Sequence, residues 1–220
     1  NTDTNKVVFT GEIKDKLDNK SAGETDFYGD FSSVTAEGTY KIKTASLGES
    51  YKFKISKDVY NNAFNDVVKM LYLQRCGSEL PQNFAGDFTH PACHNTKATI
   101  FGTQTKIDVT GGWHDAGDYG RYVVPGAKTV ADIISAYDAN PSAFSDNTGI
   151  PESGNKVPDI LDEARYELEW FLKMQDSASG GVYHKVTCAN FPGNVMPEKE
   201  TDELIVSPMS TTATADFAAT

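Results

Sequence analysis

The sequence predicts a two-part chain, in which an antiparallel β-sandwich region is followed by an all-α region. Before Ser56, aromatic and β-branched residues alternate with polar ones, as in GTYKIKT and YKFKIS, and this is the period of a half-buried strand. After Ser56 the apolar period becomes helical. Turn signals separate the strand-like runs, at Gly23, Gly29, Gly38 and Gly48.

Four short segments of the first region are the candidate strands. They are KVVFTGEIK, TDFYGDFSSV, GTYKIKT and YKFKIS. Four or five strands are few for a complete sandwich. The sequence therefore predicts part of a sandwich, over residues 1–57.

The second region is predicted to contain four helices. They cover residues 57–75, 126–138 and 158–175, and a fourth begins within SPMSTTATADFAAT. Ser56 is a plausible N-cap for the first helix, and Pro158 suits the first turn of the third. The acidic residues of LDEARYELEW are expected to form the solvated face of the third helix. Residues 76–121 and 176–206 are expected to be irregular, and a loop as long as the first is usually functional.

Composition excludes some classes of function. The 220 residues carry a formal net charge of -11, which argues against binding to nucleic-acid phosphates because that requires a basic face. No apolar run is long enough to cross a membrane, and the start, NTDTNKVVFTGE, has no visible signal peptide. Three cysteines are too few for a disulfide scaffold.

The stretch GGWHDAGDYGRY holds the first candidate site, at Asp115 and Asp118. Two carboxylates three positions apart on a tight turn can lie on the same side and share a water, and one of them can act as a base. This spacing alone is more often a solvated turn or a helix N-cap. The neighbouring glycines permit close approach, and flat rings such as Trp113 and Tyr119 are suited to stacking on a sugar. These neighbours favour the water-activating site of an inverting glycosidase.

A second candidate site consists of two thiols and two imidazoles. Such a set satisfies the tetrahedral coordination of a structural zinc, although the spacing is not that of a zinc finger. A disulfide between Cys76 and Cys93, or two buried free cysteines, is an equal alternative. The position of the set in or beside the long irregular segment favours a metal. The four residues are Cys76, Cys93, His94 and His114.

Two further residues are treated separately. His184, in GGVYHKVTCANFPG, could contact sugar hydroxyls, and a surface histidine in a hairpin is at least as good an interpretation. Cys188 is expected to be a packed free thiol.

Three segments closely resemble glycoside hydrolase family 9, the inverting cellulases. They are GGWHDAGDYGRYV, IPESGNKVPDILDEARYELEWFLKMQ and VSPMSTTATADFAAT. The segment before them resembles the latter part of the immunoglobulin-like domain of one branch of that family, and RCGSELP…HPACH resembles the zinc-binding loop of the same branch. The resemblance covers essentially the whole chain.

The resemblance implies a partial immunoglobulin-like β-sandwich over 1–57 and the first part of an (α/α)6 barrel over 58–220. It implies an endo-β-1,4-glucanase that cleaves β-1,4-glucan with inversion. Asp118 would be the general base, Asp115 would help to hold the water, and His184 would contact substrate. The general acid would be a glutamate beyond Thr220. The implied structural zinc ligands are Cys76, Cys93, His94 and His114.

Several expectations depend on that resemblance. The enzyme would be secreted, because polymeric cellulose cannot enter a cell. Calcium is possible in the full-length enzyme, with no ligands assigned. The chain alone is expected to be inactive, and the remainder of its barrel could be a partner as a separate chain. The alternatives are a non-catalytic glycan-binding module stabilised by zinc, or an exo-acting cellobiohydrolase or glucosidase, or a xyloglucanase, on the same scaffold.

Overall fold

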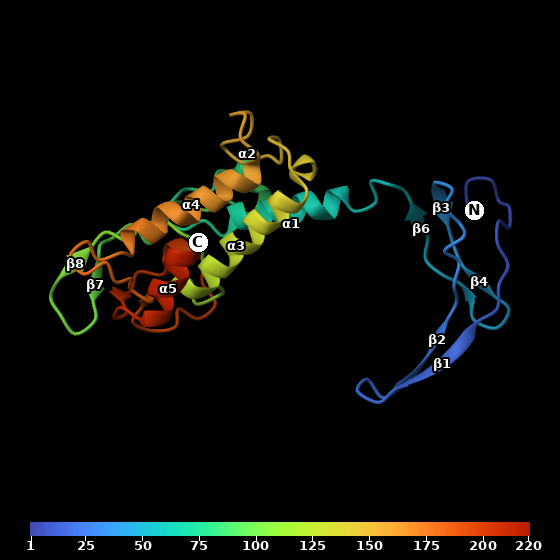
Figure 1. The fold of residues 1–220 in the computed structure, drawn as a ribbon, viewed down its shortest axis with the longest axis horizontal. Coiled ribbons are helices and arrows are strands. Elements are labelled where there is room, and N and C mark those ends of the chain that lie inside the picture. The colour runs from blue at the N-terminus through green and yellow to red at the C-terminus, as the bar shows by residue number, and fades with distance from the viewer. The chain divides into compact units, whose positions relative to one another are not determined.

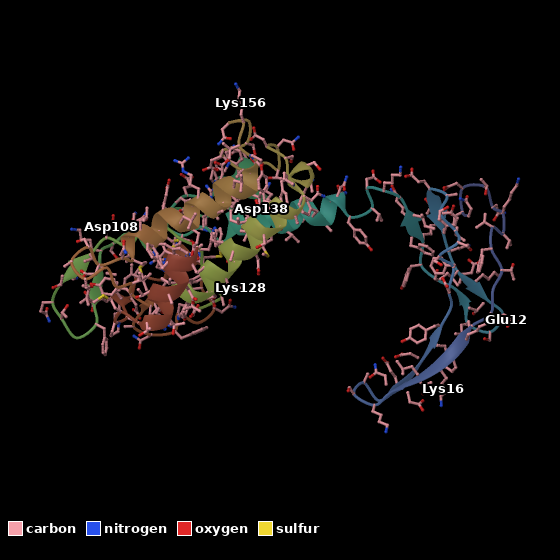
Figure 2. All side chains as sticks on the ribbon, viewed as in Figure 1. Glu12, Lys16, Asp108, Lys128, Asp138 and Lys156 are labelled. Atoms are coloured by element: carbon pink, nitrogen blue, oxygen red, sulfur yellow. The ribbon has the colours of Figure 1, made fainter. Side chains whose placement is uncertain are left out.

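The computed structural model describes residues 1–220 apart from the side chain of Asp15, and the chain divides into two compact units (Figure 1). The N-terminal unit comprises Asn1–Phe64 and the C-terminal unit Asn65–Thr220. Charged side chains such as Lys16, Lys128 and Lys156 are exposed on these units (Figure 2). Among the described residues, no helix has the length and apolar character needed to span a bilayer.

The N-terminal unit is built from short strands that pair in antiparallel twos. The three pairs are β1 (Lys14–Asn19) with β2 (Glu24–Tyr28), β3 (Gly38–Tyr40) with β6 (Phe53–Ile55), and β4 (Lys43–Thr44) with β5 (Gly48–Glu49). The antiparallel pairing agrees with the prediction. A strand over KVVFTGEIK was wrong for residues 6–13, which form none, because no neighbouring strand among the described residues supplies a ladder for them.

The core of this unit is small. Tyr40 is its one buried residue among those whose side chains are described. The ring of Phe53 lies 5.7 Å from that of Phe31 and 6.3 Å from that of Tyr40, and the Tyr40 hydroxyl donates to Ala36 O at 2.8 Å. Two-stranded sheets with so little buried apolar surface are marginal by themselves.

The predicted helices are present in the C-terminal region of the chain, with shifted ends. The helices are α1 (Asn61–Leu73), α2 (Gln82–Ala85), α3 (Val123–Ala139), α4 (Asp159–Lys173) and α5 (Thr211–Ala219), with 3-10 turns η1 (Gly86–Phe88), η2 (Pro141–Ala143) and η3 (Pro197–Lys199). Ser56 does not cap α1, since the helix starts five residues later and the Ser56 hydroxyl bonds to Asp58 instead. Pro158 directly precedes α4.

Helix α3 packs against both α4 and α5 (Figure 1). Its contact with α4 is close at Gly126, where an added Cβ would lie 2.4 Å from Glu167 Oε1 and 3.2 Å from the Phe171 ring. Val130 and Ile133 of α3 are buried, as are Trp170 and Phe171 of α4. A small residue at position 126 is therefore what lets these two helices meet.

The two segments predicted to be irregular contribute a five-stranded sheet, so this unit is not purely helical. The strand order is β8-β7-β11-β10-β9. The strands are β7 (Ala98–Ile100), β8 (Lys106–Ile107), β9 (Arg121–Tyr122), β10 (Lys185–Cys188) and β11 (Leu204–Val206). The β7–β11 pair is parallel and the others are antiparallel. Strands of two to four residues are too short to give a recognisable period-two pattern.

Candidate active site and metal centre

The loop that carries the two aspartates begins directly after a short β-bridge, which fixes where its backbone starts. The segments around Arg75 and Trp113 pair as an antiparallel bridge, with Cys76 N donating to Gly112 O at 2.8 Å and His114 N donating to Gln74 O at 2.7 Å. The loop is then closed by Asp115 N, which donates to Gly120 O at 2.8 Å.

Within this loop Asp118 is oriented by two donors. Gly120 N donates to Asp118 Oδ1 at 3.1 Å, and the Tyr122 hydroxyl donates to Asp118 Oδ2 at 2.5 Å. That hydrogen bond raises the pKa of Tyr122 to about 12, so the phenol remains a donor at any physiological pH. Asp118 is half-buried. The arrangement can hold a carboxylate in one orientation for proton abstraction.

Asp115 differs from Asp118 in its surroundings. It is exposed, and none of the described residues donates a hydrogen bond to its carboxylate. A second acceptor beside an oriented carboxylate can bind a water molecule between the two. Sequence reasoning named the aspartates and missed Tyr122 as the residue that orients Asp118. Its position four residues after Asp118, just past the turn at Gly120, is the signal that could have indicated it.

The predicted metal ligands come together. Cys76 Sγ lies 3.5 Å from His94 Nδ1 and 4.0 Å from Cys93 Sγ, and Cys93 Sγ lies 3.6 Å from His114 Nε2. The four donor atoms all lie within 4.8 Å of one another, and all four residues are buried. The cysteines are free, so the alternative disulfide is not formed in this structure. This group could hold a metal ion.

Electrostatics at the group favour one thiolate. The hydrogen bond with Cys76 and those with His114 and His94 lower the pKa of Cys93, whereas burial raises the pKa of the Cys76 thiol. Burial also lowers the pKa of His114. A thiolate and neutral imidazoles are the forms that bind a metal.

Two residues from outside the ligand set lie against it. The Tyr119 ring lies 5.2 Å from that of His114 and 6.1 Å from that of His94, and its hydroxyl donates to Val195 O at 2.5 Å. His94 Nε2 lies 3.0 Å from Glu200 Oε2. Tyr119 therefore packs over the candidate metal ligands, and its ring contacts the imidazoles of His114 and His94. The sequence contained no signal for Glu200.

Trp113 lies in the interior and not on the surface of the predicted site. Trp113 is only 7% exposed, and its indole Nε1 donates to Glu163 Oε2 at 3.4 Å. Gly112 beside it has a φ of 78°, and an added Cβ would lie 2.6 Å from the Trp170 ring. The glycine does permit close approach, but here to a tryptophan of α4. This geometry does not favour Trp113 as a sugar platform.

The sheet brings His184 to the same region as Tyr122. Val123 N donates to His184 O at 3.1 Å, and Lys185 pairs with Tyr122 across β10 and β9. The half-buried His184 ring lies with Nδ1 3.2 Å from Ser210 Oγ, and Ser210 caps α5 by accepting from Ala213 N. Cys188 is buried and free, as predicted.

The acidic residues of α4 correct the prediction of a solvated face. Asp162, Glu163 and Glu167 are buried, and only Glu169 of the acidic residues in LDEARYELEW is exposed. Burial raises the pKa of Glu163 to about 7 and that of Glu167 to about 8. These carboxyl groups face inward because the segments around Arg75 and Trp113 pass beneath the helix.

Their partners hold the two segments that lead to the site. Arg75 Nη2 lies 2.9 Å from Glu163 Oε1, and the same guanidinium binds both carboxylate oxygens of Glu152 at 3.0 Å. Trp113 N donates to Glu167 Oε2 at 2.8 Å. Arg75 directly precedes Cys76, and Trp113 directly precedes His114. Helix α4 therefore anchors the backbone next to two of the candidate ligands.

Comparisons with known proteins agree on one family. Residues 60–220 match the family model described as glycosyl hydrolase family 9, and residues 1–49 match that of the cellulase N-terminal ig-like domain. Endoglucanase D of Acetivibrio thermocellus is 43% identical over 223 residues, which cover 97% of this chain and 35% of that protein. Cellodextrinase of Butyrivibrio fibrisolvens is 42% identical over 218 residues, which cover 97% of this chain and 40% of that protein.

A solved structure agrees in fold. The chain is similar to a protein described as a Zn-binding triple mutant of GH family 9 endoglucanase J30, with a TM-score of 0.89 and 33% identity, over 99% of this chain and 42% of that one. The chain thus spans about a third of the length of the curated relatives it matches.

Proposed function

Because this chain belongs to glycosyl hydrolase family 9, we propose that a full-length protein carrying it is an endo-β-1,4-glucanase that hydrolyses β-1,4-glucosidic bonds with inversion. The observation that carries the proposal is the loop at 115–120. There a carboxylate oriented by Tyr122 lies three positions from an exposed second carboxylate. The coverage of this family model, 60–220, includes the whole loop.

In the proposed mechanism Asp118 is the general base. Its Oδ2 accepts from Tyr122, which holds the carboxylate while the other oxygen can accept a proton from water. Asp115 is the second acceptor that holds this water for attack at the anomeric carbon. An inverting enzyme places a carboxylic acid on the opposite face of the sugar, roughly 6.5–9.5 Å from the base.

The proposed general acid is a glutamate outside residues 1–220. Two glutamates later in the chain, Glu200 and Glu203, are engaged with other residues. Glu200 is buried against His94, and Glu203 accepts from the Thr99 hydroxyl at 2.6 Å and lies near Lys106. Each carboxyl group already has a partner within the chain, and neither is assigned the role of the acid.

Substrate contacts are proposed at His184 and at the edge of Tyr119. With Nδ1 directed at Ser210, the Nε2 of His184 is the nitrogen available to a sugar hydroxyl. A β-1,4-glucan is the proposed partner. Because such a polymer cannot enter a cell, we propose a secreted protein.

The proposed metal is a structural zinc. Tetrahedral zinc with bonds of about 2.0–2.3 Å places neighbouring donors about 3.3–3.8 Å apart. The separations of 3.5–4.0 Å between neighbouring Cys and His donors are close to these values. Cys76, Cys93, His94 and His114 would hold it. Four protein ligands leave no open position, so the metal would staple the loop and supply no catalysis. Calcium in the full-length protein stays a prediction without assigned ligands.

The domain boundaries and the barrel are also part of the proposal. Residues 1–57 would belong to an immunoglobulin-like domain, and residues 58–220 to the first part of an (α/α)6 barrel. The family-model matches over 1–49 and 60–220 support this division. The rival is a non-catalytic glycan-binding module, which would bind soluble glucan and leave it intact.

The activity is tested with Asp118→Asn in the full-length protein. General base catalysis typically contributes about 10²–10⁴-fold, so hydrolysis of a soluble β-1,4-glucan should fall by that factor, while Glu169→Gln, on the exposed face of α4, should leave it unchanged. The first product should have inverted configuration by NMR. Retention of configuration, or an unaffected rate in Asp118→Asn, would contradict the proposal.

The isolated 220-residue chain supplies a second test. Without the acid it should not turn over glucan. Hydrolysis by the chain alone that disappears in Asp118→Ala would mean that an acid lies within these residues, or that a second chain completes the site.

Zinc is tested by metal analysis of the purified protein. We expect about one zinc ion per chain at this centre, lost in the double variant Cys93→Ser His94→Ala. Absence of zinc together with a Cys76–Cys93 disulfide by mass spectrometry would refute the metal centre.

A second candidate activity is cleavage of short soluble oligomers. It is favoured by the identity to cellodextrinase, 42%, which is almost that to endoglucanase D, 43%. Viscometry separates the two: an endoglucanase lowers the viscosity of a long glucan early in the reaction, whereas an enzyme acting on oligomers releases small sugars with little change in viscosity. Analysis of the sugars released in the same reaction distinguishes exo-acting and xyloglucan-cleaving activities.

A further inference from the structure

The candidate metal centre has a carboxylate beside it that belongs to none of the four ligands. We infer that Glu200 is a positioning residue for this centre: it accepts the Nε2 proton of His94 and so directs Nδ1 toward the metal. The inference rests on the proposed zinc. It assigns to the connection between β10 and β11 a role in holding the segment that carries the four candidate ligands, residues 76–114, called here the metal loop.

The two nitrogens of His94 face different groups. Nδ1 lies 3.5 Å from Cys76 Sγ, on the ligand side, and Nε2 lies 3.0 Å from Glu200 Oε2. A neutral imidazole has one N–H and one lone pair. Because Glu200 accepts the proton of Nε2, the lone pair is on Nδ1, where the metal would be. A histidine ligand hydrogen-bonded in this way to a carboxylate is a recurrent arrangement at metal sites.

Burial makes the contact strong and its absence costly. The His94 and Glu200 side chains are 2% and 3% exposed. A carboxylate removed from water to this degree needs a compensating positive charge or several donors. Among the described residues, Glu200 Oε1 has no hydrogen-bond partner. A divalent ion on the far side of the His94 ring supplies the positive charge that this carboxylate otherwise lacks.

The His94 backbone also requires an external constraint. Its φ is 50°, in the left-handed region that non-glycine residues rarely occupy. Such a conformation persists where surrounding contacts determine it. The Glu200 contact and the metal would act on the two sides of the ring and hold the residue there.

Glu200 and Val195 both belong to the β10–β11 connection. Val195 O accepts from Tyr119 in the loop of the acidic pair. The connection therefore touches the metal loop through His94 and the acidic loop through Tyr119. Cys188, at the end of β10, lies within the same group as His94 and Glu200, their donor atoms being within 4.8 Å of one another.

The test measures metal binding, in a full-length protein carrying this chain. The variants are Glu200→Ala, which removes the acceptor, and Glu200→Gln, which keeps a neutral acceptor of the same shape. Glu203→Gln is the matched control, because Glu203 is exposed and three residues further along. Zinc affinity is measured by chelator competition, and the ligand field by the visible absorption of the Co²⁺-substituted protein. Circular dichroism confirms folding.

We expect Glu200→Ala to weaken zinc binding by roughly 10–100-fold with one ion still bound at this centre. Glu200→Gln should lose less affinity because its amide oxygen can still accept from Nε2. Both should shift the Co²⁺ bands, which a purely structural contact would leave in place. Glu203→Gln should match the wild type in both measurements.

Two outcomes would overturn the inference. Unchanged affinity and Co²⁺ bands in Glu200→Ala would show that the carboxylate does not act on His94. A second ion in the wild type that Glu200→Ala loses would make Glu200 a direct ligand, together with Cys188. A wild-type protein that binds no zinc would instead refute the proposed metal centre itself.

Discussion

Replacing Glu167 by glutamine tests the most unexpected part of the structure, the buried acidic side of α4. The Glu167 carboxyl group is fully buried and accepts from Trp113 N at 2.8 Å. Glutamine keeps the shape and an acceptor oxygen, and it cannot ionise. A difference between the two proteins that varies with pH therefore reports the titration of this carboxyl group, together with its interaction with the nearby charge of Glu163.

The size of the effect follows from the pKa. Burial raises the pKa of Glu167 from 4.5 to about 8, and one pKa unit corresponds to about 1.4 kcal/mol. A carboxyl group whose pKa is raised in the folded protein stabilises the fold fully below its unfolded pKa, and this contribution is lost as the pH rises through the folded value. Over about 3.5 pH units the loss is on the order of 5 kcal/mol.

The assay is equilibrium unfolding in denaturant from pH 4.5 to 9, with zinc present throughout. Trp113 lies against α4 and Trp170 belongs to it, so tryptophan fluorescence follows the unfolding of this region. Relative to the wild type, Glu167→Gln should gain stability steadily from pH 5 to pH 8 and then level off. Any fixed cost of accommodating the amide adds the same amount at every pH.

Glu169→Gln is the matched control, on the same helix and exposed. It should show no such slope. The reasoning is refuted if the difference between wild type and Glu167→Gln is constant from pH 5 to pH 9, because the carboxyl group would then titrate alike in the folded and unfolded chain.

Two other predictions concern the acidic loop. Tyr122→Phe removes the hydroxyl that donates to Asp118. Because a hydrogen bond to a charged group contributes about 1.5–3 kcal/mol, kcat/KM on a soluble glucan should fall roughly 10–100-fold with unchanged thermal stability. A wild-type rate would mean that Asp118 needs no such orientation. Gly112→Ala places a Cβ 2.6 Å from the Trp170 ring at a φ of 78°, and it should lower the free energy of unfolding by about 1–3 kcal/mol. Gly117→Ala, whose Cβ would meet no atom within 4 Å, is its control, and equal denaturation midpoints for the two variants would disprove the close contact.

The parts of the site that depend on rare residue types could be predicted from sequence. Only three cysteines and four histidines occur in the chain, so a group of two thiols and two imidazoles had few possible members. The structure brings those members within 4.8 Å. The helices were also predictable, because α3 and α4 are long enough for their period to be visible, although α1 starts later than its apparent cap.

The acidic residues of α4 show where such reasoning fails. A carboxylate is usually a solvated group, and nothing local distinguishes Glu167 from Glu169. The difference lies in partners distant in sequence: Arg75 is 88 residues from Glu163, and Trp113 is 54 residues from Glu167. The sequence pattern of a helix does not show which other segments pack on it. In α4, the segments around Arg75 and Trp113 pack on the acidic residues and bury them.

The five-stranded sheet was missed for a related reason. Each of its strands has two to four residues, and their alternation is too brief to be read. Their existence depends on pairing between 98–122 and 185–206. The same dependence explains residues 6–13, which are rich in strand-forming residues but have no neighbouring strand among the described residues.

The parallel pairing of β7 with β11 has a consequence for the order in which the chain assembles. Thr99 faces Ile205, and the residues between them include α3 and α4, so this pairing closes a very long loop. The four candidate ligands, by contrast, all lie between Cys76 and His114. During synthesis from the N-terminus, a nascent chain has all four ligands available well before β11 exists. Capture of the proposed zinc could therefore precede closure of the sheet, and the later connection that carries Glu200 would dock onto a centre that is already formed.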